Sequence, residues 1–160
     1  IPRAHTVDES LLAQHLEKHP NLQVEIVNDD TASVLSRARA AFATSGTVTL
    51  EAAILGTPMV ISYAVNMLSA LVFHLCVRNA HVGLPNIVAG REVCPELLQS
   101  AGTPQALAKA IIPLMDDTKE RQNQVAGLQE VRQLLGQSGS IGRIVSAMTP
   151  YFQEGDIPCP

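Results

Sequence analysis

The feature that most constrains the fold is a short strand that leads directly into a helix. Residues 40–44 form an apolar run, a Ser-Gly-Thr sequence occupies positions 45–47, and a helix is expected over residues 48–55. Gly56, with a proline two positions later, ends that helix, and residues 59–63 are rich in the β-branched side chains typical of strands. This rapid alternation of strand and helix predicts parallel βαβ units with right-handed crossovers.

The rest of the chain extends the α/β pattern and then becomes helical. Residues 23–27 alternate polar and apolar side chains as a strand does, and an Asn-Asp-Asp sequence caps an expected helix over residues 31–38. Further helices are expected over residues 66–77, 95–101, 104–115, 117–135 and 140–148, with a loop over 83–92 and an irregular tail over 149–160. The prediction is one α/β domain over residues 1–148, with a parallel sheet, flanking helices and a helical carboxyl-terminal part.

Composition excludes several classes of function. A net charge of −4 gives no electrostatic footprint for nucleic acid, so no nucleic-acid partner is expected. Cys76, Cys94 and Cys159 have neither metal-ligand spacing nor the even number of a disulfide framework, which indicates a reducing, cytoplasmic compartment. No apolar run reaches the roughly 18 residues that span a bilayer, and no signal peptide is expected. The chain starts at Ile1 without a methionine, as a fragment would.

The first candidate site is the junction between the strand ending at Thr44 and the following helix. Backbone N–H groups at a helix N-terminus are unpaired and carry partial positive charge, so they bind anions. Ser45 and Thr47 add hydroxyl donors, and Gly46 lets a ligand approach the backbone closely. Thr47 and Glu51 share a helical face, so a phosphate near Thr47 places an attached ribose near the Glu51 carboxylate. An ordinary capped helix with Glu51 in solvent explains this segment equally well.

The second candidate site is the loop over residues 84–92. Ligands of doubly wound sheets gather at the carboxyl ends of the strands, where such a loop is expected. Asn86 can bind a sugar or phosphate oxygen, and Arg91, which precedes Glu92, can pair with phosphate or with Glu51. A connecting loop with a capping asparagine and a helix-start glutamate is the simpler alternative, and this segment alone favours it.

The histidines give weaker signals. His15 and His19 lie four apart on an expected helix, but no third metal ligand accompanies them, so a solvated helix face is the better interpretation and no metal site is expected. His5 and His74 are expected to be structural, and His81 is notable only for its closeness to the second candidate site. No nucleophile triad and no paired carboxylates for hydrolysis are apparent in the sequence.

The order and spacing of four sequence segments can be compared with those of known protein families. They read Ser-Gly-Thr-Val-Thr-Leu-Glu at 45–51, Pro-Met-Val-Ile-Ser-Tyr at 58–63, Leu-Pro-Asn-Ile-Val-Ala-Gly-Arg-Glu at 84–92 and Glu-Leu-Leu-Gln at 96–99. Together they resemble the carboxyl-terminal half of the lipid-A-disaccharide synthase family. The 84–92 segment is the most specific, because many nucleotide-sugar transferases share the first one. The clear resemblance covers residues 40–115.

The resemblance implies a GT-B architecture, in which two Rossmann-like halves face a cleft and the carboxyl-terminal half holds the nucleotide. Residues 45–47 would then lie at the UDP diphosphate, and Glu51 at the ribose. Residues of the second segment would complete the nucleotide and sugar-phosphate pocket. The implied site consists of Ser45, Gly46, Thr47, Glu51, Asn86, Arg91 and Glu92.

The implied partners are UDP-2,3-diacylglucosamine and 2,3-diacylglucosamine 1-phosphate. The 6-hydroxyl of the second substrate attacks the anomeric carbon of the first, configuration inverts and UDP leaves. A helix dipole and side-chain donors would stabilise the leaving group, with no cofactor and no obligatory metal. The family also implies contact with the inner face of the bacterial inner membrane. The apolar helix over 66–77, which physical arguments alone predict to be buried, gains interest for that reason.

The main departure from the family is length. A complete member is a little over twice as long, and the missing amino-terminal half is where a general base is expected. The chain alone is therefore expected to bind UDP weakly and not to catalyse the transfer, and the resemblance also implies a homodimer that exchanges carboxyl-terminal elements. Two alternatives stay open: another GT-B or epimerase-type UDP-sugar enzyme, and a non-catalytic or truncated interaction module.

Overall fold

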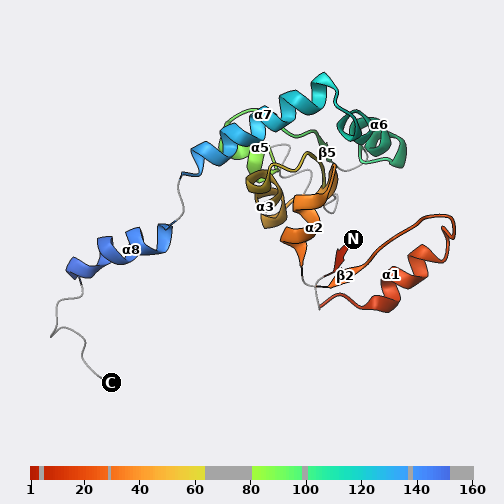
Figure 1. Cartoon of the computed structure of the whole chain (residues 1–160), viewed down its shortest axis with the longest axis horizontal. Coiled ribbons are helices and arrows are strands. Elements are labelled where there is room, and N and C mark those ends of the chain that lie inside the picture. The colour runs from red at the N-terminus through yellow and green to blue at the C-terminus, as the bar shows by residue number, and fades with distance from the viewer. Residues whose placement is uncertain (4–5, 29, 64–80, 99–100, 137–138, 152–160) are drawn as a thin grey trace, which may run out of the picture.

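The computed structural model describes residues 1–3, 6–28, 30–63, 81–98, 101–136 and 139–151 (Figure 1). In chain order the elements are β1 Pro2–Arg3, α1 Glu9–Leu16, β2 Val27–Asn28, α2 Thr31–Arg37, β3 Ala41–Thr44, α3 Thr47–Leu55, β4 Met59–Tyr63, α5 Leu84–Ala89, β5 Glu96–Leu98, α6 Pro104–Met115, α7 Lys119–Leu134, α8 Ser140–Met148 and the short 3₁₀ helix η2 Thr149–Tyr151.

The strands of the main sheet, β3, β4 and β5, are parallel, and β4 lies in the middle. Ala41 of β3 pairs with Met59 of β4, and Ile61 of β4 pairs with Glu96 of β5. The strands β1 and β2 form a separate two-stranded parallel sheet. Every strand pair in the described residues is parallel, which confirms the predicted α/β, Rossmann-like class.

The core is built around the central strand. Met59, Val60 and Ile61 of β4 are fully buried, as expected for a strand that has neighbours on both edges and helices on its faces. Two of these residues, Met59 and Ile61, join a hydrophobic cluster to which β3, the helices α2, α3 and α7, and the segment before β5 also contribute. The buried members of that cluster are Leu35, Ala43, Ala52, Ala53, Met59, Ile61, Val93, Cys94, Leu128 and Val131.

The long helix α7 is fastened to the start of β4 by one side chain. The Gln124 amide is buried, and its Nε2 donates to the Met59 carbonyl at 3.0 Å. Its Oε1 accepts from the Met59 backbone N–H at 2.9 Å. Because both groups belong to the first residue of the strand, Gln124 extends the sheet's hydrogen bonding into the helix and fixes where α7 crosses β4.

The helix α8 extends away from the rest of the fold (Figure 1). It continues directly into η2, and all of its described side chains are exposed. Ile141, Ile144, Val145 and Met148 follow the i, i+3, i+4, i+7 spacing of one helical face. The predicted helix over residues 140–148 is thus confirmed, but it adds nothing to the core.

Several predicted elements agree with the structure. The strand over 59–63 and the helices over 104–115 and 140–148 have the predicted bounds. The predicted elements over 31–38, 40–44, 48–55 and 117–135 differ from the structure by no more than two residues at either end. The predicted apolar helix over 66–77 lies outside the described residues, as does most of the 149–160 tail.

Three predictions of secondary structure were wrong. The helix predicted over residues 95–101 is contradicted in its first half, where Glu96–Leu98 form β5, because pairing with β4 outweighs the helix propensity of glutamate and leucine. The segment over 83–92 is not a loop throughout, since Leu84–Ala89 form α5 and Gly90, with φ of 66°, ends it in the left-handed conformation. The strand over 23–27 shrinks to Val27–Asn28, because β1 offers only two residues to pair with.

Gly127 of α7 lies against Val93 in the segment before β5, and it provides a stability test. A Cβ at this position would lie 2.7 Å from Val93 Cγ1, which is closer than real contacts allow. Gly127→Ala is therefore expected to lower the free energy of unfolding by about 1–3 kcal/mol through overpacking. Gly142→Ala in α8 is the control, because its Cβ would meet nothing within 4 Å. Urea denaturation of both variants tests the difference, and equal stability would contradict the packing argument.

Candidate functional site

The N-terminus of α3 is open at the carboxyl end of β3. Its N-cap residue, Gly46, is exposed, and no side chain caps the helix. Helices α5 and α8 also lack a side-chain cap, whereas α1, α2, α6 and α7 are each capped by a side-chain oxygen, from Asp8, Asp30, Thr103 and Thr118. The leading N–H groups of α3 therefore point toward a surface where an anion can reach them.

The spacing argument for the first candidate site places Thr47 and Glu51 correctly. Both residues line one hollow of about 320 Å³, together with Leu50 and Ile54 of α3 and Ala32 of α2. Thr47 is exposed, and Glu51 is half-buried. The hollow thus has apolar walls with one hydroxyl and one carboxylate, a combination suited to a polar ring that carries hydroxyl groups.

Ser45 is held by the segment that precedes α5. Its Oγ donates a hydrogen bond to the Val82 carbonyl at 2.9 Å, and the side chain is half-buried. The hydroxyl proton is therefore engaged, whereas the oxygen can still accept. Ser45 can therefore accept a hydrogen bond from a ligand, but it can donate one to a phosphate only by releasing the Val82 carbonyl.

Asn86 is a buried structural centre. Its side chain is fully buried, and its Nδ2 donates to the Cys94 carbonyl and to Glu96 Oε1, both at 2.7 Å. Its Oδ1 accepts from the backbone N–H groups of Val93 and Cys94, both at 2.8 Å. These four bonds use both donors and both lone pairs of the amide. No hydrogen-bonding capacity is left for a ligand, so the contacts favour a positioning role for Asn86.

Glu96 is a buried carboxylate whose contacts the sequence does not reveal. Its side chain is 8% exposed and binds the start of α5. Oε1 accepts from the Gly83 N–H and Oε2 from the Val82 N–H, each at 2.9 Å. His81 Nδ1 lies 3.9 Å from Oε1. Nothing local in the sequence could have indicated a buried carboxylate, because its donors lie 13 and 14 residues earlier.

Arg91 and Glu92 face a different part of the molecule. Both are exposed, and they line a hollow of about 260 Å³ with Lys109 of α6 and Glu120 of α7. The Arg91 guanidinium pairs with Glu130 of α7. The suggested pairing of Arg91 with Glu51 is therefore wrong, since a partner from α7 occupies the guanidinium. The structure does not bring Arg91 and Glu92 together with Thr47 and Glu51.

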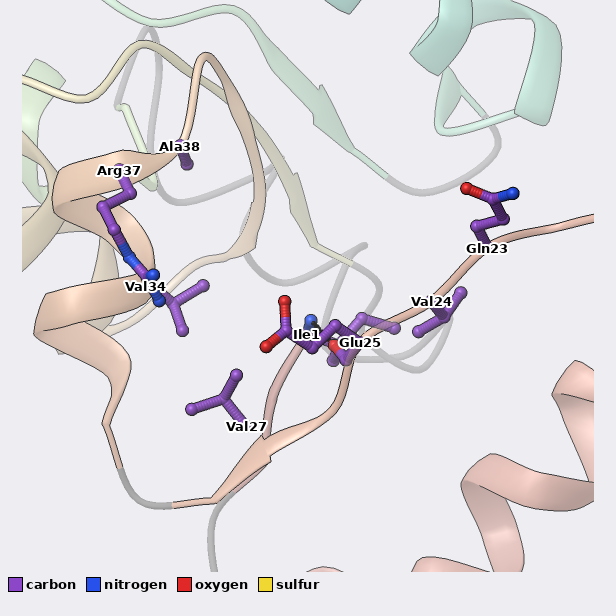
Figure 2. Close-up of a pocket in the computed structure, with 8 residues that line it drawn as sticks. All are labelled: Ile1, Gln23, Val24, Glu25, Val27, Val34, Arg37 and Ala38. Carbon is purple, nitrogen blue, oxygen red and sulfur yellow. Dashed lines mark hydrogen bonds between the residues drawn. The ribbon is translucent and has the colours of Figure 1, made fainter.

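A third hollow, of about 430 Å³, lies between the start of the chain and α2 (Figure 2). Val24, Val27 and Val34 give it apolar walls, and Arg37 and Glu25 add charges of opposite sign. Figure 2 shows Val27 and Val34 facing the same space as Ile1 and Glu25. None of the residues predicted for the nucleotide site lines this hollow.

The thiol and imidazole groups in the described residues do not form a reactive centre. Burial raises the pKa of the Cys94 thiol to about 12, and the nearby Glu96 and Glu92 carboxylates act in the same direction. His15 lies in the last turn of α1, whereas His19 follows the helix, so the two do not share a helical face. Within the described ranges, no three His, Cys, Asp or Glu side chains gather as a metal site would require.

No helix in the described part of the chain combines the length and the apolar character that a bilayer crossing needs.

Fold and site together define a class of protein. A parallel sheet flanked by helices, with an open helix N-terminus at the carboxyl end of a strand, is the architecture of a Rossmann-like GT-B half. A family model described as lipid-A-disaccharide synthetase matches residues 2–143. The chain therefore belongs to the lipid-A-disaccharide synthetase family.

Individual relatives agree with the family model. The chain is 40% identical over 144 residues to the lipid-A-disaccharide synthase of Anaeromyxobacter sp. (strain K), covering 90% of this chain and 38% of that protein. It is 36% identical over 156 residues to the synthase of Syntrophus aciditrophicus (strain SB), covering 98% and 41%. For the synthase of Burkholderia pseudomallei (strain K96243), identity is 44% over 122 residues, covering 76% and 31%. The chain thus spans well under half the length of these relatives.

Proposed function

We propose that this chain is the UDP-sugar-binding, carboxyl-terminal part of an inverting glycosyltransferase. The transferase joins UDP-2,3-diacylglucosamine to 2,3-diacylglucosamine 1-phosphate and gives lipid A disaccharide 1-phosphate and UDP. Family membership supports the reaction, because the relatives that match the chain are named lipid-A-disaccharide synthases. The observation that carries the nucleotide site is the open N-terminus of α3, with Thr47 and Glu51 lining one hollow.

Each part of the site has a proposed task. The diphosphate of UDP lies at the N-terminus of α3, where the N–H groups near Gly46 and the Thr47 hydroxyl donate to it. The Glu51 carboxylate accepts hydrogen bonds from the ribose hydroxyls. When the glycosidic bond breaks, negative charge grows on the diphosphate, and the dipole of α3 stabilises it.

The residues of the second candidate site, 84–92, have other proposed roles than those of the first. Asn86 acts as a positioning residue, because its amide ties α5 to Val93 and Cys94 and reaches no ligand itself. Arg91 and Glu92 remain proposed for the sugar-phosphate end of the substrate, on the strength of the Leu-Pro-Asn-Ile-Val-Ala-Gly-Arg-Glu motif. For Arg91 to bind phosphate, its ion pair with Glu130 has to open.

The proposal extends to the setting of the whole enzyme. Residues 1–148 form the nucleotide-sugar domain, and the catalytic base belongs to the amino-terminal half. The lipid substrates place the enzyme on the cytoplasmic face of the inner membrane. A homodimer that exchanges carboxyl-terminal elements is also proposed, and the freely exposed α8 is compatible with it. Elution of the chain as a strict monomer in size-exclusion chromatography would count against that dimer.

Glu51→Ala tests the nucleotide site. Removal of a charged hydrogen-bond partner is expected to weaken UDP binding by about 1–3 kcal/mol, or roughly 5- to 150-fold. Isothermal titration calorimetry or ligand-observed NMR with UDP measures the change. Glu17→Ala is the matched control, because Glu17 is an exposed glutamate at the end of α1, outside the proposed site.

Two outcomes of this titration would contradict the proposal. If the unaltered chain gave no signal even at millimolar UDP, a preformed site would be excluded. If Glu51→Ala bound UDP as tightly as the unaltered chain, a non-catalytic interaction module would be the better interpretation. A loss confined to Glu51→Ala, with Glu17→Ala unaffected, supports the site.

A further inference from the structure

We propose that Glu96 is a positioning residue that fixes the segment 81–83 beneath Ser45 and thereby sets how Ser45 meets the nucleotide. The inference rests on the proposed function, because it concerns the same UDP site. It goes beyond it by giving a task to a buried carboxylate that does not itself line the hollow around Thr47 and Glu51.

The first step is the set of hydrogen bonds by which Glu96 holds the segment 81–83. Its two oxygens accept from two successive backbone N–H groups, Val82 and Gly83, each at 2.9 Å. The Asn86 Nδ2 donates to the same Oε1 at 2.7 Å. A carboxylate that is 8% exposed and accepts three hydrogen bonds has little freedom to move. The segment before α5 is therefore anchored to the first residue of β5.

The second step is the contact with the site. Val82 is held on its other side as well, because its carbonyl accepts from Ser45 Oγ at 2.9 Å. Ser45 lies between β3 and the open N-terminus of α3. A chain of hydrogen bonds thus runs from Glu96 through Val82 to Ser45. While Val82 holds the hydroxyl proton, Ser45 meets the nucleotide only as an acceptor, and movement of Val82 would change where the accepting oxygen points.

The third step is the lack of room for adjustment. A Cβ on Gly83 would lie 2.4 Å from Ile61 Cδ1 and 3.1 Å from Glu96 Oε1. The backbone of the segment therefore lies directly against the central strand and the carboxylate. Packing on one side and hydrogen bonds on the other allow one position, so that Val82 presents its carbonyl to Ser45 in a single orientation.

The fourth step explains why a carboxylate is needed. All three partners of Glu96 are donors, and an ionised carboxylate can accept at both oxygens. The Gln side chain has the same shape, but its NH₂ group would face one of these donors. Glu96→Gln therefore keeps the side-chain volume but loses at least one of these hydrogen bonds. It tests the hydrogen bonds more specifically than a truncation, which would also change the packing.

A double-mutant cycle with Ser45→Ala tests this inference. UDP affinity is measured for the 160-residue chain, the two single variants and the double variant. Glu96→Gln is expected to weaken UDP binding about tenfold, the size of one lost hydrogen bond. In the Ser45→Ala background, Glu96→Gln is expected to have no further effect. Glu17→Gln on α1 is the control and should bind as the unaltered chain does.

Additive losses would overturn the proposal, because Glu96 would then act on binding through something other than Ser45. An unchanged affinity in Glu96→Gln would overturn it too. Glu96→Asp keeps both acceptor oxygens but shortens their reach, and it replaces Glu96→Gln if that variant does not fold. It should weaken UDP binding in the same way, and again only while Ser45 is present.

Amide hydrogen exchange separates this inference from the proposed function. Without ligand, the Val82 and Gly83 amides should exchange at least tenfold faster in Glu96→Gln than in Glu17→Gln. If the unaltered chain did not bind UDP, but the Val82 and Gly83 amides lost protection in Glu96→Gln, the proposed function would be contradicted. The hydrogen bonding of this segment by Glu96 would still be supported. Equal protection of both amides in the two variants would overturn the role of Glu96 whatever the result with UDP.

Discussion

Asn86→Ala is expected to lower the free energy of unfolding by about 3–5 kcal/mol. The substitution leaves the Val93 and Cys94 N–H groups and the Cys94 carbonyl without their buried partner, and each unpaired group costs about 1–3 kcal/mol before relaxation. Because a typical domain has only about 5–15 kcal/mol in total, this one change could remove a third or more of it. Urea denaturation followed by circular dichroism measures the loss.

Two further variants sharpen the Asn86 test. Asn123→Ala on α7 is the matched control, since Asn123 is exposed, and it should change stability by less than about 0.5 kcal/mol. Asn86→Asp keeps the shape but places a second carboxylate beside Glu96. The oxygen that replaces Nδ2 faces two acceptors, the Cys94 carbonyl and Glu96 Oε1, so the site holds a neutral Asp side chain better than a charged one, and the deficit of Asn86→Asp relative to the unaltered chain should shrink as the pH falls. A loss below 1 kcal/mol in Asn86→Ala would contradict the structural role.

Gln124→Met is expected to lower the free energy of unfolding by about 2–4 kcal/mol. Methionine fills nearly the same volume, so packing is retained, but the N–H and carbonyl of Met59 both lose their buried partner. Gln122→Met, at an exposed position on the same helix, controls for the effect of methionine itself. Thermal and urea unfolding of the two variants give the difference. Similar stabilities for the two would show that α7 does not depend on its tie to β4.

The elements that the sequence predicted well carry their own local signals. Helix α6 begins with Thr103 as a side-chain cap and a proline in its first turn, and its predicted bounds were correct. The strand β4 was correct because its β-branched residues follow the Gly-Thr-Pro stop of α3. Strand β5 failed because its structure comes from pairing with β4, 35 residues earlier, and its own residues favour a helix.

The predictions for the candidate site succeeded or failed for the same reason. The four-residue spacing of Thr47 and Glu51 was enough to predict that they share a face, and both line one hollow. The pairing of Arg91 with Glu51 was predicted from charge alone. In the fold, Arg91 pairs with Glu130, which lies 39 residues later in the chain. Glu96 was missed because a glutamate before two leucines gives no sign that long-range backbone donors surround it. Local geometry could be read from the sequence, whereas partners distant in the chain could not.

Because Cys94 is buried, chemical labelling of its thiol reports the opening of the surrounding part of the fold. Because its pKa is raised to about 12, the closed fold presents almost no thiolate to a reagent at neutral pH. Labelling of Cys94 must therefore wait until its surroundings separate, and those surroundings include the backbone groups that Asn86 holds. In a chain with Cys76 and Cys159 replaced by serine, the labelling rate reports how often this part of the fold comes apart. A ligand that binds only the closed form would slow it.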